Sequence, residues 1–237
     1  PEAAWALSLR VDHGKVRFEY VPGGVNFYGG DAVQNNDTAN VSVQTWLSRL
    51  QANLRTPGGI QYMPDPGYTG PDTLTVIVND NGNTGTGPGY MEALYIPVEV
   101  YGSDMERWQH LHFTEADLDD PLLEPTVWGD QANPDGDPFN NLFEYLLTGD
   151  PWLAESEPLI EYGFDGIHIW MRFPVRKIHP GITWHGEWGS ALDSASWNTS
   201  GIVSKIVEEL QFHDLMEIRV PFVDPGRKFL RIEVKRE

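Results

Sequence analysis

The chain of 237 residues contains no cysteine and only 16 Lys and Arg against 35 Asp and Glu, giving a formal net charge of −19. Without cysteine there is no disulfide framework, no thiolate metal site and no cysteine nucleophile. The shortage of basic side chains disfavours nucleic acid and anionic membrane surfaces as partners, because both are negatively charged. The sequence also lacks an apolar run of about 18 residues, so we expect no membrane insertion.

Recognisable catalytic motifs are missing as well. The sequence has no G-x-S-x-G, no H-E-x-x-H and no phosphate-cradling glycine motif. The carboxylate pairs Asp119/Asp120 and Glu208/Glu209 are adjacent, so in a strand their side chains would point to opposite faces. We therefore expect that the protein is not an enzyme.

The sequence does contain enough apolar material for packed cores, since hydrophobic residues make up 40% of it. Its length favours two domains. Alternating apolar residues, typical of half-buried strands, occur near both ends, as in Trp5 to Val11 and Ile167 to Phe173. Gly, Pro, Asn and Asp separate these short runs, which favours β-sandwiches.

A change in composition near Gly102 suggests a domain boundary. Residues 103–157 are rich in Asp, Glu and Pro, and the alternation returns after them. We therefore predict a mostly β fold with a first sandwich at 1–102, an acidic linker at 103–157 carrying a calcium-type loop and a short helix, and a second sandwich at 158–237. Within the first domain, Val43, Trp46, Leu47, Leu50 and Leu54 have helical spacing and predict a short helix.

The stretch from Ile60 to Asp80, with Tyr62, Pro64, Tyr68, Gly70 and Asp72 followed by alternating Leu74, Val76 and Val78, resembles the cadherin-like, immunoglobulin-like repeats of giant bacterial adhesins. The resemblance covers about residues 4–100 and implies an extracellular or cell-surface protein. Asp72 and Asp80 are open to two interpretations: turn formation, which we favour, or calcium ligation.

Repeats of this family normally open with another strand or two before the region that starts here at Ala4. An edge strand beside Trp5–Val11 would then be missing, and a strand from a neighbouring chain could complete the sheet. This pattern predicts head-to-tail fibres; the alternative is that the chain is truncated and lacks the opening strands. The fibre prediction fails if the chain covers that edge with its own residues.

An acidic loop precedes the apolar run that starts at Phe139. Its side chains match the ligand positions of an EF-hand-type calcium loop, with Phe139 offering its carbonyl oxygen. The ligand set is Asn133, Asp135, Asp137, Phe139, Asn141 and Glu144. These are hard oxygen ligands, which suit calcium at a weak extracellular affinity of about 0.1–1 mM. The alternative is an acidic turn in which Asp135 and Asp137 only cap the following helix.

Residues 107–234 are similar to a recurring C-terminal module of large exported proteins of Verrucomicrobia-type bacteria. The resemblance rests on the Asn133-Pro134-Asp135-Gly136-Asp137 run, on Asn141 to Pro151, on Trp188 to Leu192 and on Lys228 to Arg231. Two positions differ from that module. Asn133 replaces an Asp, and Pro138 replaces a glycine that normally has positive φ, so the loop must bend differently.

The sequence thus predicts an extracellular structural or adhesive module that binds calcium and associates with copies of itself or with other surface proteins. The alternative is a carbohydrate-binding module. Trp170 alternates with His168 and Arg172 on the polar face of a strand, where an exposed indole could stack on a sugar ring.

Overall fold

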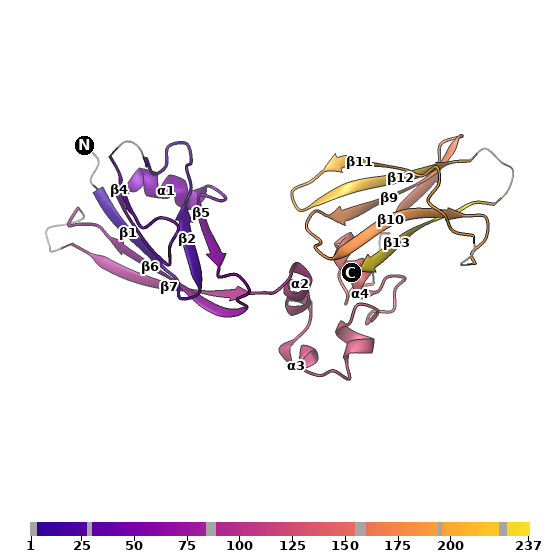
Figure 1. Ribbon diagram of the computed structural model, residues 1–237, viewed down its shortest axis with the longest axis horizontal. Coiled ribbons are helices and arrows are strands. Elements are labelled where there is room, and N and C mark those ends of the chain that lie inside the picture. Colours follow the sequence, from indigo (N-terminus) through magenta and orange to yellow (C-terminus); the bar gives the residue numbers. More distant parts are fainter. Residues whose placement is uncertain (1–3, 28–29, 84–88, 155–159, 194–195, 223–226) are drawn as a thin grey trace. The chain divides into compact units, whose positions relative to one another are not determined.

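The computed structural model describes residues 4–27, 30–83, 89–154, 160–193, 196–222 and 227–237. Its contacts divide the chain into two compact units, Pro1–Gly102 and Ser103–Glu237. Both units are built on antiparallel sheets, with short helices in the segment between the two β regions (Figure 1). The protein is therefore mostly β, as predicted.

The first unit contains a five-stranded sheet in the order β3-β4-β1-β6-β7 and a two-stranded sheet made of β2 and β5. The strands are β1 (Ala4–Arg10), β2 (Gly14–Phe18), β3 (Ala32–Gln34), β4 (Asn40–Trp46), β5 (Ile60–Pro64), β6 (Gly70–Asn79) and β7 (Met91–Val100). Leu7 and Leu9 of β1 and Val41 and Val43 of β4 share one core with Val16 and Phe18 of β2. The two sheets therefore face each other across this core.

The helix expected from Val43 onward is shorter than predicted. Val43 and Trp46 belong to β4, and α1 covers only Leu47–Arg55. The alternation of Val41, Val43 and Thr45, all buried, suits a strand better than a helix. Leu54 is exposed, whereas its polar neighbour Asn53 is buried.

The strand predicted to lie at an open edge is in the middle of its sheet. β1 pairs with β4 on one side and with β6 on the other, over most of its length. The expectation that another chain completes the edge beside Trp5–Val11 is therefore wrong. The two strands that flank β1, β4 and β6, follow it in the chain by about 30 and 60 residues. The sequence alone could therefore not reveal this pairing.

The second unit has a four-stranded sheet in the order β11-β12-β9-β8 and a two-stranded sheet of β10 and β13. The strands are β8 (Glu161–Phe164), β9 (His168–Arg176), β10 (Ile182–Gly189), β11 (Val203–Glu209), β12 (His213–Pro221) and β13 (Phe229–Arg236). Before them come α2 (Asp104–His112), α3 (Glu115–Leu118), the π-helical turn η1 (Glu124–Trp128) and α4 (Asn141–Leu147).

The segment 103–157, expected as a linker, supplies much of the second unit's core. Trp108 of α2 and Tyr145 of α4 are almost fully buried, and their rings meet edge to face with centroids 5.9 Å apart. They belong to the same core as Phe173 of β9 and Ile218 of β12. The segment is acidic on its surface but apolar where it meets the sheet. Its overall composition, which is dominated by the acidic residues, does not reveal the apolar face. Within the described ranges, no helix combines the length and apolar character that a membrane crossing requires.

Candidate functional site

The acidic loop before α4 is closed by its own side chains. Asn133 accepts a hydrogen bond from the Gly136 N–H at 2.8 Å and donates one to the Asp137 carbonyl at 2.6 Å. Gly136 has φ of +78°, so the reversal that an EF-hand makes at its sixth position is made here two residues earlier. This explains how Pro138 is tolerated.

The two loop aspartates each use one carboxylate oxygen within the loop. Asp135 Oδ1 accepts from the Asp137 N–H at 3.1 Å, and Asp137 Oδ1 accepts from the Phe139 N–H at 2.7 Å. The second oxygen of each, Oδ2, is buried and has no hydrogen-bond partner. A buried carboxylate oxygen without a donor is costly, and a bound cation would remove that cost.

Two further ligand candidates lie on α4, directly after the loop. Asn141 is fully buried; its amide donates to the carbonyls of Val127 and Gly129, and its Oδ1 has no hydrogen-bond partner. Glu144 is only 1% exposed. Polar side chains are this deeply buried only where something compensates their lost hydration.

The helix cap is a different residue from the loop aspartates. Asn140 precedes the first residue of α4, and its side chain accepts from the Phe143 N–H at 3.1 Å. Asp135 and Asp137 therefore form the acidic turn of the alternative interpretation, with Asp137 accepting from the Phe139 N–H, but they do not cap α4 itself. Phe139 is half-buried, and its ring stacks on that of Phe143.

The candidate ligand atoms of the acidic loop do not converge on one point. Within the described ranges, the one group of three His, Asp or Glu ligand atoms lying within 4.8 Å of one another is elsewhere, at His185, Glu187 and Glu233. Calcium would therefore have to draw the carboxylates of Asp135, Asp137 and Glu144 together. Asn133 would also have to release its own hydrogen bonds to serve as a ligand.

The hydrogen bonds of Asp72 give it a structural role in the first unit. Its carboxylate is 6% exposed and accepts from the backbone N–H groups of Asp12, His13 and Thr73 and from the Tyr62 hydroxyl. Burial raises the pKa of Asp72, but these four donors outweigh burial and leave it below its ordinary value. The carboxylate thus ties the β1–β2 turn to β5. Asp80 has a similar environment, accepting from the N–H groups of Gly82 and Tyr90.

Trp170 does not present a free ring. It lies on β9 opposite Gly163 of β8, where a side chain larger than hydrogen would collide with the indole. The Arg172 guanidinium lies over the ring, 4.7 Å from its centroid. Because stacking on a sugar needs an open aromatic face, this residue gives little support to a carbohydrate-binding site.

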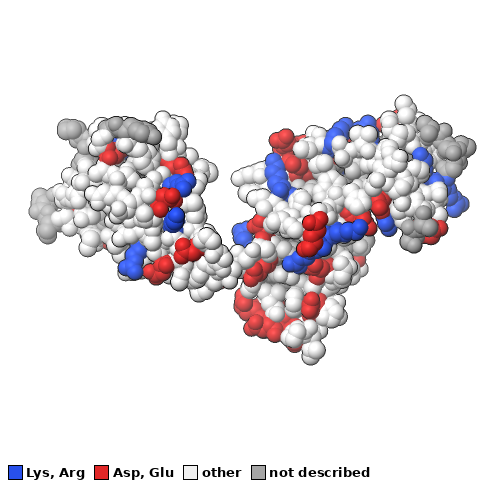
Figure 2. All heavy atoms as spheres, viewed as in Figure 1, with Lys and Arg blue, Asp and Glu red and all other residues white. Residues whose placement is uncertain are grey.

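An ion-pair cluster occupies the outer face of the same sheet. Glu217 of β12 is 1% exposed and is surrounded by Arg172, Lys205 and Arg219, from three neighbouring strands. Burial raises the pKa of Glu217, but the three cations outweigh burial and hold it at about 2. Figure 2 shows how positive and negative side chains intermingle over the second unit. The cluster neutralises a buried acid, which is a stabilising role.

Strand β7, at one edge of the five-stranded sheet, has exposed side chains on both faces. Among the described strands it pairs with β6 alone. Leu94 and Ile96 lie opposite Val76 and Leu74 of β6, which reach the core, yet Leu94 is 59% exposed. On the other face Tyr95 is 67% exposed. Among the described residues, the core between the two sheets of this unit contains none from β7.

Two features are not predicted by the sequence: the exposure of β7 and the group formed by His185, Glu187 and Glu233. The alternation of His185 and Glu187 is visible in the sequence, but their partner comes from a strand far along the chain. A scan against protein-family models and a search of the curated proteins find no match to this chain.

Proposed function

We propose that this chain is an extracellular structural or adhesive module of a large bacterial surface protein, made of two β-sandwiches of the immunoglobulin-like or cadherin-like kind. The proposal rests on the two sequence resemblances for its location and on β7 for its activity. An edge strand with apolar side chains exposed on both faces is unusual in a monomeric protein, because it can pair with another chain.

We propose a second copy of the same strand as the occupant of this edge. An antiparallel pair of β7 strands centred on Tyr95 would set Glu92 opposite Val98 and Glu99 opposite Met91, so no two carboxylates would face each other. Pro97 lacks an N–H and would face Ala93, which limits how far the ladder can extend. Such an isologous contact closes at two copies. The opposite edge, β3, has three residues and offers little for fibre growth.

Sedimentation velocity over a range of concentrations tests this association. We expect a concentration-dependent dimer that Leu94→Lys and Tyr95→Glu each weaken at least tenfold. Leu54→Lys is the matched control, because Leu54 is also 59% exposed in the same unit but lies on α1. A monomer at all concentrations, or equal weakening by the control, would contradict the proposal. Fibres in electron micrographs would point to a different contact.

We further propose that calcium stabilises the second unit at the loop before α4. Its ligands would be drawn from Asn133, Asp135, Asp137, the Phe139 carbonyl, Asn141 and Glu144. The supporting observation is the set of buried oxygens without hydrogen-bond partners on Asp135, Asp137 and Asn141. Calcium would neutralise the carboxylates and join the loop to the core helix.

Thermal melting with and without millimolar calcium tests this site, with magnesium as the comparison ion. We expect calcium to raise the melting temperature of the second unit, and Glu144→Gln and Asp137→Asn to abolish that rise. Asp119→Asn, which removes an exposed carboxylate from the same segment, should leave it unchanged. If calcium gives no shift, or an equal shift in all three variants, the site does not exist.

A further inference from the structure

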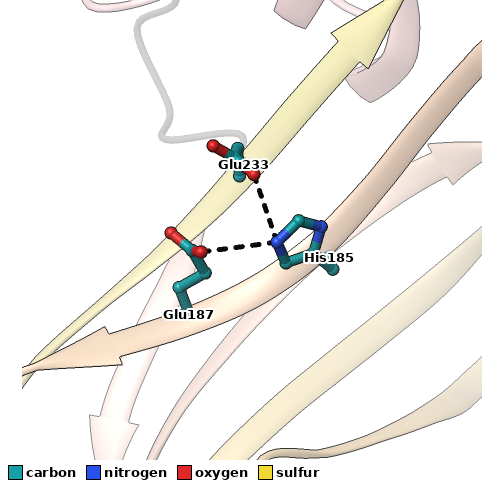
Figure 3. Close-up of side chains that lie close together, drawn as sticks. All are labelled: His185, Glu187 and Glu233. Atoms are coloured by element: carbon teal, nitrogen blue, oxygen red, sulfur yellow. Dashed lines mark hydrogen bonds and ion pairs between the residues drawn. The ribbon is translucent and has the colours of Figure 1, made fainter. Parts of the chain in front are cut away.

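Three metal-ligating side chains converge on the outer face of the sheet formed by β10 and β13 (Figure 3). His185 and Glu187 are two residues apart on β10 and so share one face, and Glu233 lies directly opposite His185 on β13. Between them, Gly186 faces inward, since a Cβ there would meet Ile218 of the core. The three side chains therefore point away from the core, each only partly exposed.

The spacing of the ligand atoms fits one small ion. His185 Nε2 lies 3.4 Å from Glu187 Oε1 and 3.2 Å from Glu233 Oε2, and one ligand atom of each residue lies within 4.8 Å of the other two. Zinc bonds of about 2.0–2.1 Å in a tetrahedron place neighbouring ligand atoms roughly 3.3 Å apart. Hydrogen bonds assisted by charge are shorter, at about 2.7–2.9 Å.

The charges of the group can accommodate a cation. Two carboxylates and an imidazole face the same point, and Arg231 and Lys235 balance the two carboxylates when no ion is bound. A divalent ion placed among the three ligand atoms would take over part of that balance.

Neighbouring side chains hold one carboxylate in place. Arg231 donates to Glu187 Oε2 through Nε at 2.8 Å and Nη2 at 2.6 Å, leaving Oε1 directed at His185. The Arg231 guanidinium lies 4.2 Å from the centroid of the Trp197 ring. Support of this kind, which orients a ligand from outside, is typical of metal sites.

A second cation competes for the other carboxylate. Lys235 Nζ lies 2.8 Å from Glu233 Oε2, the same oxygen that faces His185. Its side chain is 62% exposed, so it can turn into solvent when an ion arrives. Lys235 should therefore weaken metal binding without preventing it.

We propose that His185, Glu187 and Glu233 bind a zinc ion, with water completing the tetrahedron on the side open to solvent. An imidazole and two carboxylates suit zinc, whereas calcium takes six to eight oxygen ligands. This site is separate from the loop before α4 and does not depend on the function proposed above. It adds a transition-metal site to the second unit.

Isothermal titration of the full chain with zinc chloride at pH 7.5 tests the site. We expect one saturable site per chain, weakened at least tenfold in His185→Gln and in Glu233→Gln. Lys235→Met should bind zinc more tightly than the parent protein, a gain that general damage to the fold would not produce. Controls are His168→Gln, whose ring meets one carboxylate alone at 3.3 Å, and Glu144→Gln in the acidic loop; both should bind zinc normally.

Three results would overturn the proposal. The first is the absence of saturable zinc binding, and the second is equal zinc affinity in the parent and in His185→Gln. The third is that Glu144→Gln loses zinc binding while His185→Gln keeps it. Cobalt(II) provides an independent readout, because a tetrahedral site with a nitrogen ligand gives a strong visible absorption. That absorption should appear with the parent protein and be absent from His185→Gln.

Discussion

Arg172 and Glu217 face each other across β9 and β12, and the Arg172 Nε donates to Glu217 Oε2 at 2.7 Å. Lys205 of β11 approaches the other oxygen, Oε1, at 3.3 Å. Arg219, which lies on β12 with Glu217, also contacts Oε1. One buried carboxylate is thus neutralised by three cations on the surface of a strongly acidic protein. Its removal would leave those cations facing each other.

We expect Glu217→Gln to lower the free energy of unfolding by about 2–3 kcal/mol. This is at or below the low end of the range for breaking a buried ion pair, because the three cationic partners are partly exposed. Urea unfolding measures the change. Glu209→Gln, at an exposed position of β11, is the control and should change stability by no more than about 0.5 kcal/mol.

The same residue should make stability depend on pH in the acid range. The folded pKa of Glu217 is about 2, below its ordinary value of 4.5, so the ionised group stabilises the fold above pH 4.5. That contribution is lost as pH falls from 4.5 towards 2. Urea unfolding at pH 6, 4 and 3 should therefore show a steeper loss for the parent protein than for Glu217→Gln. Parallel curves would show that the carboxylate is not specially stabilised.

Asn53→Ala should destabilise the first unit by about 2–4 kcal/mol. Asn53 is 1% exposed; it accepts from the Val25 N–H at 2.8 Å and donates to the carbonyls of Glu19 and Gly59, both at 2.9 Å. The substitution removes the side-chain partner of the buried Val25 N–H and of the Glu19 carbonyl, whereas the Gly59 carbonyl keeps its bond from the Glu19 N–H. Chemical denaturation provides the measurement. The neighbouring Leu54→Ala, at an exposed position, should cost less than about 1 kcal/mol.

Asp72→Asn should cost about 2–3 kcal/mol, although the side chain keeps its size. All four donors point at carboxylate oxygens, so the new NH₂ group would face N–H or O–H donors and at least one bond would be lost. Tyr62→Phe removes one of these bonds and should cost about 1 kcal/mol. Thermal melting of both variants compares them. Equal costs would mean that the Tyr62 hydroxyl, rather than the backbone N–H groups, dominates this contact.

Several elements were predictable because their causes are local. The alternation from Trp5 onward predicts β1, and the Asp-Gly-Asp run predicts a tight acidic loop, which Gly136 indeed turns with a positive φ. Local spacing also misled where two periods overlapped. Val43 fits a helical spacing with Leu47 and Leu50, but it also alternates with Val41 and Thr45. Because all three alternating side chains are buried against the core, this segment forms a strand.

Residues 103–157 show why composition was insufficient. Acidic side chains dominate a count over this segment, but Trp108, Phe113 and Tyr145 point inward and pack with the sheet. An average over a segment does not show which side chains share a face.

The mostly β character of this protein, its strong negative charge and the positions of its turns and oxygen-rich loop all follow from local features of the sequence. The pairing of distant strands was decided by the tertiary structure alone. It placed β1 inside its sheet, left β7 at the edge, and set Glu233 opposite His185. The physical reason is that backbone hydrogen bonds between strands are chemically the same everywhere, so the partner and register are chosen by packing of the whole core.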